Sequence, residues 1–163
     1  MDKKNKLVFE GVGEPDFQTI ASKLQNMIES NALHYIYFSG GIGAGKTSYI
    51  RILLKNIGIT ENIKSPSFSM IECYRKKKKT ICHVDLFRME NPSAWQHGEI
   101  RSLFEEDDNL VFLEWPEKAK GLPCPDIHFT ITLGNYKHEE KKRDVSMYLK
   151  RIQLLEMFNK CDY

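Results

Sequence analysis

Residues 39–47 read SGGIGAGKT, and this short stretch restricts the possible folds more than any other part of the chain. It matches the pattern G-x-x-x-x-G-K-[ST], in which Gly40 and Gly45 are the two glycines and Lys46 and Thr47 follow. The apolar run before it, HYIYF, has the composition of a strand, and apolar residues recur at helical spacing after it. The sequence therefore predicts a strand, a glycine-rich turn and a helix, in that order.

A loop of this kind binds phosphate through its backbone. N–H groups at a helix N-terminus point inward around an anion, and the glycines let phosphate oxygens approach closely. Lys46 would reach the β- and γ-phosphates as a point charge, and the Thr47 hydroxyl would bind Mg²⁺. We therefore predict a nucleoside triphosphate site. Its loop residues are Gly40, Gly41, Ile42, Gly43, Ala44, Gly45, Lys46, Thr47 and Ser48.

Composition and charge set the broad class of the protein. The chain has 163 residues, of which 41% are hydrophobic and 28% charged, which is ordinary for a soluble protein. This length corresponds to about one domain, which we assign to residues 1–150, leaving 151–163 as a C-terminal tail of unknown role. The net charge of +2 is too weak to indicate nucleic acid or an anionic membrane as a partner.

The N-terminal segment MDKKNKLVF is basic but lacks the apolar core of a secretory signal peptide. No run approaches the roughly 18 apolar residues that span a bilayer. We therefore expect a cytoplasmic protein that makes no contact with a membrane.

Hydrophobic periodicity predicts an α/β fold. Besides the elements around the glycine-rich turn, the first half of the chain is expected to form a strand at 6–13, a helix at 14–30 and a hairpin at 70–85. The second half is expected to form a helix at 91–108, capped by Asn91 or Ser93, and a strand ending at 114. A second hairpin is expected at 126–155, and its last part is helical. These elements predict a P-loop NTPase-like three-layer sandwich with a mixed, mainly parallel central sheet and β-hairpins.

The first hairpin carries a basic run and two cysteines. We interpret its expected tip, Lys76 to Lys79, as a solvated turn, with contact to RNA as the alternative. Cys73 and Cys82 could face each other across the hairpin, but a cytosolic P-loop protein favours reduced thiols. None of the four cysteines forms a C-x-x-C pair, so zinc and redox motifs are not indicated.

Two carboxylates stand where apolar strands end. Asp85 closes ICHVD, where it could hold Mg²⁺ or cap a turn, and Arg88 follows three residues later. Glu114 closes LVFLE, where it could orient or deprotonate a water, or form an ion pair with a lysine. Trp115 beside it could stack on a base or a partner, or simply pack.

The stretch NKCD, residues 159–162, matches the N-K-x-D pattern with which GTPases read guanine. A guanine-reading loop follows a buried strand and is followed by further structure, whereas this stretch lies one residue from the end of the sequence. No D-x-x-G pattern accompanies it, so we interpret the match as chance.

Four separated stretches, taken together, resemble one family: GGIGAGKTSYIRILLKNIGI, IKSPSFSMIECY, HVDLFR and LEWPEK. The loop pattern alone is generic, but S-P-[ST]-F, H-x-D-L-[YF]-R and E-W-P in series are specific. Over roughly Phe17 to Lys118 the chain resembles the TsaE (YjeE) family. That family comprises small P-loop ATPases of the threonylcarbamoyladenosine (t6A) modification of tRNA.

The resemblance implies Mg²⁺-dependent ATP hydrolysis coupled to docking on the TsaB–TsaD heterodimer. In that scheme TsaD transfers the threonylcarbamoyl group to tRNA, and this protein resets the complex between turnovers and meets tRNA only indirectly. The positions that match the family's site are Lys46 and Glu114 as catalytic residues, Thr47, Asp85 and Glu114 as metal ligands, Thr19 and Trp115 as further nucleotide contacts, and Ser65 and Ser67 in a switch-like loop.

The chain departs from the family pattern at three positions. Gly41 stands where the family usually has an acidic residue, Ser67 replaces a threonine, and Phe87 replaces a tyrosine. The change at Ser67 keeps a hydroxyl and the change at Phe87 loses one. None of the three removes a predicted catalytic group.

Two other functions stay open. A small-molecule kinase would use Asp85 or Glu114 as the base on a substrate hydroxyl, although such kinases usually carry an arginine-rich lid and the loops here have no arginine cluster. A nucleotide-gated binding module would use ATP to order the KSPSFS loop and create a docking face without turnover.

Overall fold

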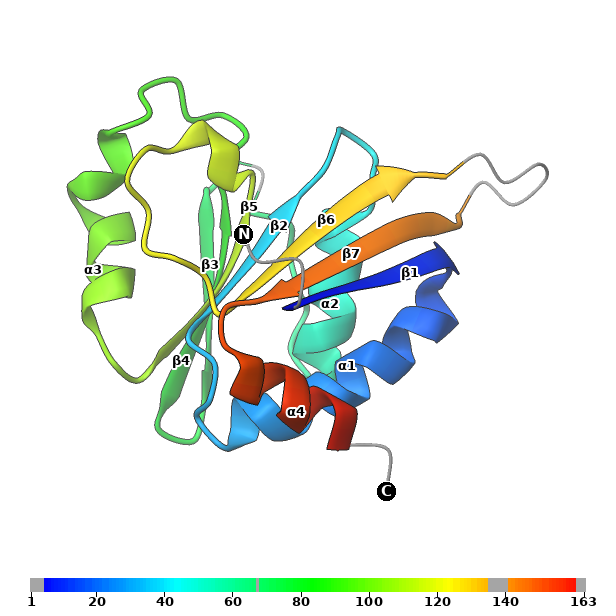
Figure 1. Ribbon diagram of the computed structural model, residues 1–163. Helices are drawn as coiled ribbons and strands as arrows, with labels where there is room; N and C mark the ends of the chain where they lie inside the picture. Colours follow the sequence, from blue (N-terminus) through cyan, green and yellow to red (C-terminus); the bar gives the residue numbers. More distant parts are fainter. Residues whose placement is uncertain (1–4, 67, 135–140, 161–163) are drawn as a thin grey trace.

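The computed structural model describes residues 5–66, 68–134 and 141–160, which fold around one seven-stranded sheet (Figure 1). The strand order across the sheet is β1-β7-β6-β2-β5-β4-β3. The strands are β1 (Lys6–Val12), β2 (Tyr35–Ser39), β3 (Ile71–Lys76), β4 (Lys79–Asp85), β5 (Asn109–Glu114), β6 (Ile127–Leu133) and β7 (Arg143–Leu149). The helices are α1 (Glu14–Glu29), α2 (Lys46–Asn56), α3 (Glu99–Glu105) and α4 (Ile152–Lys160), with the short 3-10 turns η2 (Ala94–Gln96) and η3 (Pro116–Lys118).

The middle of the sheet is parallel and its flanks are antiparallel. Strands β6, β2, β5 and β4 run in one direction. β3 pairs antiparallel with β4, β7 with β6, and β1 with β7, so β1 again runs with the central strands. Helices α1, α2 and α4 cover one face of the sheet and α3 covers the other (Figure 1). The predicted three-layer sandwich with a mixed, mainly parallel sheet is therefore confirmed.

The two faces of the sheet bury different side chains, because successive residues of a strand point to opposite faces. In β2, Ile36 and Phe38 pack in the core beneath α1 and α2, whereas Tyr37 packs in the core beneath α3. Since both faces are covered, the central strands read as continuous apolar runs. Their register places Asp85, at the end of β4, directly beside Glu114, at the end of β5.

Helix α1 begins and packs as its sequence predicts. The Asp16 carboxylate accepts the N–H of Gly13 at 2.8 Å, and Pro15 lies in the first turn. The buried residues are Phe17, Ile20, Ala21, Leu24, Met27 and Ile28, the face expected from their spacing. In the described ranges, no helix is long and apolar enough to cross a membrane.

The helix predicted over residues 91–108 is wrong in its extent. The structure has the 3-10 turn η2 first, and α3 begins only at Glu99. Gly98 separates the two with a φ of 72°, a left-handed value that no α-helix contains. Of the two predicted caps, Ser93 occupies the N-cap position of η2 but makes no side-chain capping hydrogen bond. The side-chain oxygen of Asn91 accepts the N–H of Ser93 at 3.0 Å, in the turn that precedes η2.

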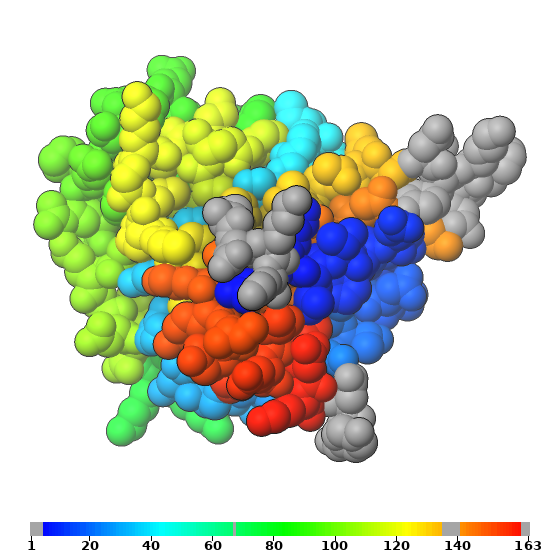
Figure 2. All heavy atoms as spheres, viewed as in Figure 1, coloured from blue at the N-terminus to red at the C-terminus, as the bar shows by residue number. Residues whose placement is uncertain are grey.

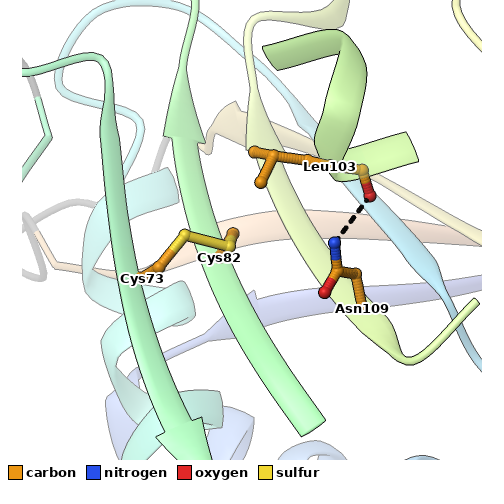
Figure 3. Close-up of a disulfide and its surroundings, with 4 residues drawn as sticks. All are labelled: Cys73, Cys82, Leu103 and Asn109. Atoms are coloured by element: carbon orange, nitrogen blue, oxygen red, sulfur yellow. Dashed lines mark hydrogen bonds between the residues drawn. A yellow bond between two sulfur atoms is a disulfide. The ribbon is translucent and has the colours of Figure 1, made fainter. Parts of the chain in front are cut away.

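Two polar side chains hold this layer against the rest of the fold. Buried Asn109, at the start of β5, donates its side-chain N–H to the carbonyl of Leu103 in α3 at 3.1 Å (Figure 3). The indole N–H of Trp95 donates to the carbonyl of Lys120 at 2.7 Å. Both donors are therefore satisfied where burial would otherwise make them costly.

The lysine run KKKK is only partly a solvated turn. Lys76 donates to the carbonyl of Ile57, at the end of α2, and Lys79 donates to the carbonyl of Ile28, in the last turn of α1, at 2.8 Å. An ammonium group in such a place satisfies a terminal carbonyl and complements the negative end of the helix dipole. The prediction of a free, solvated run is therefore wrong for these two lysines.

We expect Lys79→Ala to lower the free energy of unfolding by about 1 kcal/mol, because it removes a charged donor from the end of α1. Lys78→Ala is the matched control at the exposed turn, with an expected change within about 0.5 kcal/mol. Urea denaturation followed by circular dichroism measures both. Equal losses in the two variants would contradict the capping role.

A disulfide joins Cys73 of β3 to Cys82 of β4 (Figure 3). The two residues are direct cross-strand partners, and their Cα atoms lie 4.2 Å apart. The prediction of reduced thiols is therefore wrong for this pair. That prediction relied on the rule that cytosolic proteins keep their thiols reduced. The structure pairs the two cysteines because the register of β3 and β4 places them opposite each other.

Thiol titration of the unfolded protein, prepared without reductant, is expected to give two free thiols, and four after reduction, because the sequence holds four cysteines. Cys73→Ser should give three thiols in both conditions, since Cys82 loses its partner. Reduction should lower the free energy of unfolding by about 2 kcal/mol. Four thiols before reduction would rule out the disulfide.

Residues 152–160 form a helix that packs on the rest of the chain. Leu154 and Phe158 of α4 are buried in the same core as the apolar face of α1. The space-filling view shows the side chains of α4 lying against β1 and α1 (Figure 2). Of the NKCD stretch, residues 161 and 162 lie outside the described residues.

Candidate nucleotide-binding site

The glycine-rich loop joins the end of β2 to the start of α2. Gly43 and Gly45 have φ values of 74° and 100°, in the left-handed region that favours glycine. Gly40 has a φ of 148°, and a Cβ atom on it would lie 2.4 Å from the carbonyl oxygen of Ile131 in β6. The backbone therefore requires glycine at Gly40 to pass close to the neighbouring strand.

Gly40→Ala is expected to lower the free energy of unfolding by about 2 kcal/mol, because its Cβ would overlap a backbone oxygen that cannot move aside cheaply. Gly41→Ala is the matched control. A Cβ there would meet no atom within 4 Å, so we expect a change within about 0.5 kcal/mol. Thermal unfolding of the pair tests this, and similar melting temperatures would refute the close approach.

Lys46 is the first residue of α2, and its ammonium group lies folded back on the loop. It is 4% exposed and donates to the carbonyl oxygens of Gly40 and Gly41 at 2.7 and 2.9 Å. The ammonium also lies 3.6 Å from the ring centroid of Trp115. Burial lowers the pKa of Lys46 below its usual value, and the charge of Glu114 partly opposes this shift. Lys46 therefore places one positive charge against the backbone of the loop.

The two predicted carboxylates meet at the same edge of the sheet. Asp85 is 6% exposed and Glu114 is 2% exposed. Oε1 of Glu114 accepts a hydrogen bond from the Thr47 hydroxyl at 2.7 Å and lies 2.8 Å from Nε2 of His83. Oδ1 of Asp85 accepts the N–H of Phe87 at 2.9 Å. Parallel register therefore brings the acidic groups to the start of the loop helix.

A cavity of about 380 Å³ lies between the loop and these carboxylates. The residues that line it come from the loop, from α2 and from the ends of β4 and β5. They are Ile42, Gly43, Gly45, Lys46, Thr47, Ser48, Asp85, Phe87, Glu114 and Trp115. Chain segments far apart in sequence thus meet around one space of ligand size.

Some predicted residues lie elsewhere. Thr19 is exposed on α1 and borders a separate groove with Phe9, Glu10 and Lys23, so the structure does not bring it to this cavity. The guanidinium of Arg88 lies 4.4 Å from the ring of Phe68, outside the lining residues.

The loop that was expected to switch runs from the end of α2 to β3. Ser65 is half-buried, and Ser67 lies outside the described residues. The end of this loop contacts the site's strand, because the carbonyl of Met70 accepts the N–H of Asp85 at 2.9 Å. One backbone hydrogen bond therefore joins the end of this loop to the strand end that carries a predicted metal ligand.

Trp115 follows Glu114 with a φ of 62°, an uncommon value for a bulky residue. Its N–H donates to the carbonyl of Phe38 in β2 at 3.1 Å, and its ring lies 5.1 Å from that of Phe87. The left-handed turn therefore directs the indole over Lys46, into the wall of the cavity. Unusual backbone of this kind concentrates at functional sites.

Arg143, at the start of β7, is a site residue that the sequence did not reveal. Its Nε donates to the carbonyl of Ala44 at 3.1 Å and its Nη2 to the carbonyl of Gly43 at 3.4 Å. The contact spans 99 residues of sequence, and no local pattern marks it. It places a second positive charge against the back of the loop.

The oxygen groups at the cavity suit a hard cation such as Mg²⁺. Thr47 offers a hydroxyl, and Asp85 and Glu114 offer carboxylates. Within the described ranges, no group of three or more His, Cys, Asp or Glu side chains gathers as a metal site. In nucleotide sites, Mg²⁺ is usually held by one or two carboxylates together with substrate phosphates and waters.

A mixed sheet, a glycine-rich loop between β2 and α2, and carboxylates at the ends of β4 and β5 define a P-loop NTPase type of fold. The crystal structure of YdiB from Bacillus subtilis has a similar fold, with a TM-score of 0.71 over 97% of each chain at 18% identity.

The sequence over most of the chain then identifies the family. A model of the family described as threonylcarbamoyl adenosine biosynthesis protein TsaE matches residues 13–145. The chain belongs to the TsaE family, as its four motifs predicted.

Individual proteins similar to this chain are named as members of the TsaE family. The tRNA threonylcarbamoyladenosine biosynthesis protein TsaE of Haemophilus influenzae is 40% identical over 62% of this chain and 63% of its own length. The corresponding protein of Rickettsia felis is 34% identical over 70% of this chain and 65% of its own length. The chain therefore covers less than two thirds of each of these relatives.

Proposed function

We propose that this protein is a Mg²⁺-dependent ATPase that acts in the t6A modification of tRNA. The observation that carries the proposal is the meeting of Lys46, Thr47, Asp85 and Glu114 around one cavity at the start of α2. Hydrolysis of a nucleoside triphosphate needs a cationic loop, an oxygen group that binds the metal and a group that orients the attacking water. This cavity offers side chains suited to each of these tasks.

Each residue has a role in the proposed reaction. Loop N–H groups and Lys46 bind the β- and γ-phosphates, while Thr47 and Asp85 would hold Mg²⁺. Bound Mg²⁺ neutralises charge on the phosphate oxygens. Glu114 accepts a hydrogen bond or a proton from the water that attacks the γ-phosphorus, and ADP leaves. The aromatic wall of Phe87 and Trp115 limits the access of other waters.

The partner of this reaction is proposed from the family. ATP binding would favour docking on the TsaB–TsaD heterodimer, and hydrolysis would release the complex for another transfer of the threonylcarbamoyl group. In this scheme the protein works in the cytoplasm and meets tRNA only through its partners. The capping contacts of Lys76 and Lys79 support that part, because they direct two of the ammonium groups of a candidate RNA surface to helix-end carbonyls.

Phosphate release from Mg²⁺–ATP, measured for the purified chain alone and with the TsaB–TsaD heterodimer, tests the proposal. We expect slow turnover alone and a clear stimulation by the heterodimer. Turnover indifferent to these partners would argue against the role in t6A modification. Transfer of the γ-phosphate to a metabolite instead of water would favour a small-molecule kinase.

A further inference from the structure

His83 lies on β4, the strand next to β5, beside the carboxylate that is proposed to act on water. Its imidazole is fully buried, and Nε2 lies 2.8 Å from Oε1 of Glu114. In the register of β4 and β5, His83 pairs with Phe112, and Asp85 pairs with Glu114. Because side chains alternate along a strand, His83 and Glu114 project from the same face of the sheet, the face that α2 covers.

Both hydrogen bonds of the Glu114 side chain fall on one oxygen. Oε1 accepts from the Thr47 hydroxyl and faces Nε2 of His83. Glu114 would act in the proposed reaction as an ionised carboxylate, which only accepts hydrogen bonds, so the proposed role requires a proton on Nε2 of His83. Within the described structure, Oε2 has no protein partner and is the oxygen left to accept from a water in the cavity.

The other ring nitrogen of His83 points to a functional reason for this residue. Nδ1 is buried and has no hydrogen-bond partner among the described residues. A buried polar atom without a partner is destabilising, and each such atom in a folded protein calls for an explanation. If this residue only filled space in the core, an apolar side chain would give a more stable fold. The contact between Nε2 and Glu114 therefore explains why the position holds a histidine.

We propose that His83 is a positioning residue whose Nε2–H holds Oε1 of Glu114, so that Oε2 faces the attacking water. The inference rests on the proposed ATP hydrolysis. The Thr47 contact comes from the helix that would bind the nucleotide, whereas the His83 contact comes from a neighbouring strand of the sheet. A displacement of a catalytic group by about 1 Å can cost about 100-fold in rate, so one rigid hydrogen bond has a large effect.

His83→Gln and His83→Asn separate this role from packing. The amide nitrogen of glutamine can reach the position of Nε2, whereas that of asparagine reaches only the position of Nδ1, and both side chains are neutral and polar. We expect His83→Asn to lower kcat for ATP about 10- to 100-fold at a nearly unchanged KM, and His83→Gln to restore most of the rate. Equal kcat values in the wild type and both folded variants, or equal losses in both, would overturn the proposal.

A second measurement does not depend on turnover. NMR of the histidine ring nitrogens in the nucleotide-free protein reports the tautomer, and the His83 signal is identified among the five histidines by its absence in His83→Gln. We expect the proton on Nε2, and a shift of this signal in Glu114→Gln. A proton on Nδ1 overturns the proposal whether or not ATP is hydrolysed.

The turnover measurements distinguish failure of the positioning role from failure of the proposed function. If the wild-type protein shows no ATP turnover, both the proposed function and the positioning role are refuted. If the wild type and all variants turn over ATP normally, only the positioning role is refuted.

Discussion

Lys46→Ala is expected to lower ATP turnover at least about 100-fold and to weaken nucleotide binding. Its ammonium lies within 2.9 Å of two loop carbonyl oxygens, at the place where the phosphates of a bound nucleotide would need a positive charge. Alanine keeps the helix start but leaves the developing charge on the γ-phosphate without this counter-charge. Phosphate release at saturating Mg²⁺–ATP gives the rate, and calorimetry with ADP gives the affinity.

Lys55→Ala is the matched control for this experiment. Lys55 lies in the last turn of the same helix and is exposed, so the same substitution removes a charge far from the loop. We expect its turnover to equal that of the wild type. Activity that persists in Lys46→Ala would show that hydrolysis takes place at another site, or in a contaminating enzyme.

Glu114→Gln is expected to lower turnover about 100- to 10,000-fold while nucleotide binding stays nearly normal. The amide keeps the size of the buried side chain and can keep the contacts with Thr47 and His83, but it cannot accept a proton from water. Measuring both kcat and the affinity for ADP on one preparation shows whether the variant loses the chemical step or loses nucleotide binding. Glu105→Gln, an exposed change on α3, is the control.

The same variant distinguishes hydrolysis from simple gating. If Glu114→Gln binds the TsaB–TsaD heterodimer with ATP but fails to release it, turnover is needed for the cycle. If release continues normally without hydrolysis, nucleotide binding alone suffices, and the protein is a gated binding module. Normal hydrolysis in the variant would remove Glu114 from the reaction altogether.

Elements governed by local spacing were predictable from the sequence. The apolar positions of α1 named the face that is buried, and the strand, turn and helix around Lys46 are confirmed in that order. Errors arose where one residue's backbone interrupts a pattern. Gly98, with a φ of 72°, divides the helix that periodicity alone would continue.

Contacts between distant segments were not predictable, because nothing in a local pattern records which segments become neighbours. Lys79 reaches a carbonyl 51 residues away, and Arg143 reaches the loop across 99 residues. The sequence places Cys73 and Cys82 in one expected hairpin, but their bond depends on a register that makes them direct cross-strand partners.

The groups that this protein has for binding a nucleotide can be read from its sequence, since the loop from Gly40 to Thr47 carries its own backbone preference and its own charge. Which other groups meet that loop depends on tertiary contacts. Parallel register puts Asp85 beside Glu114, and close packing puts His83 next to it, while Thr19 borders a different groove. The physical reason is that register and packing minimise the free energy of the whole core at once, so the position of one side chain depends on residues far from it in the sequence.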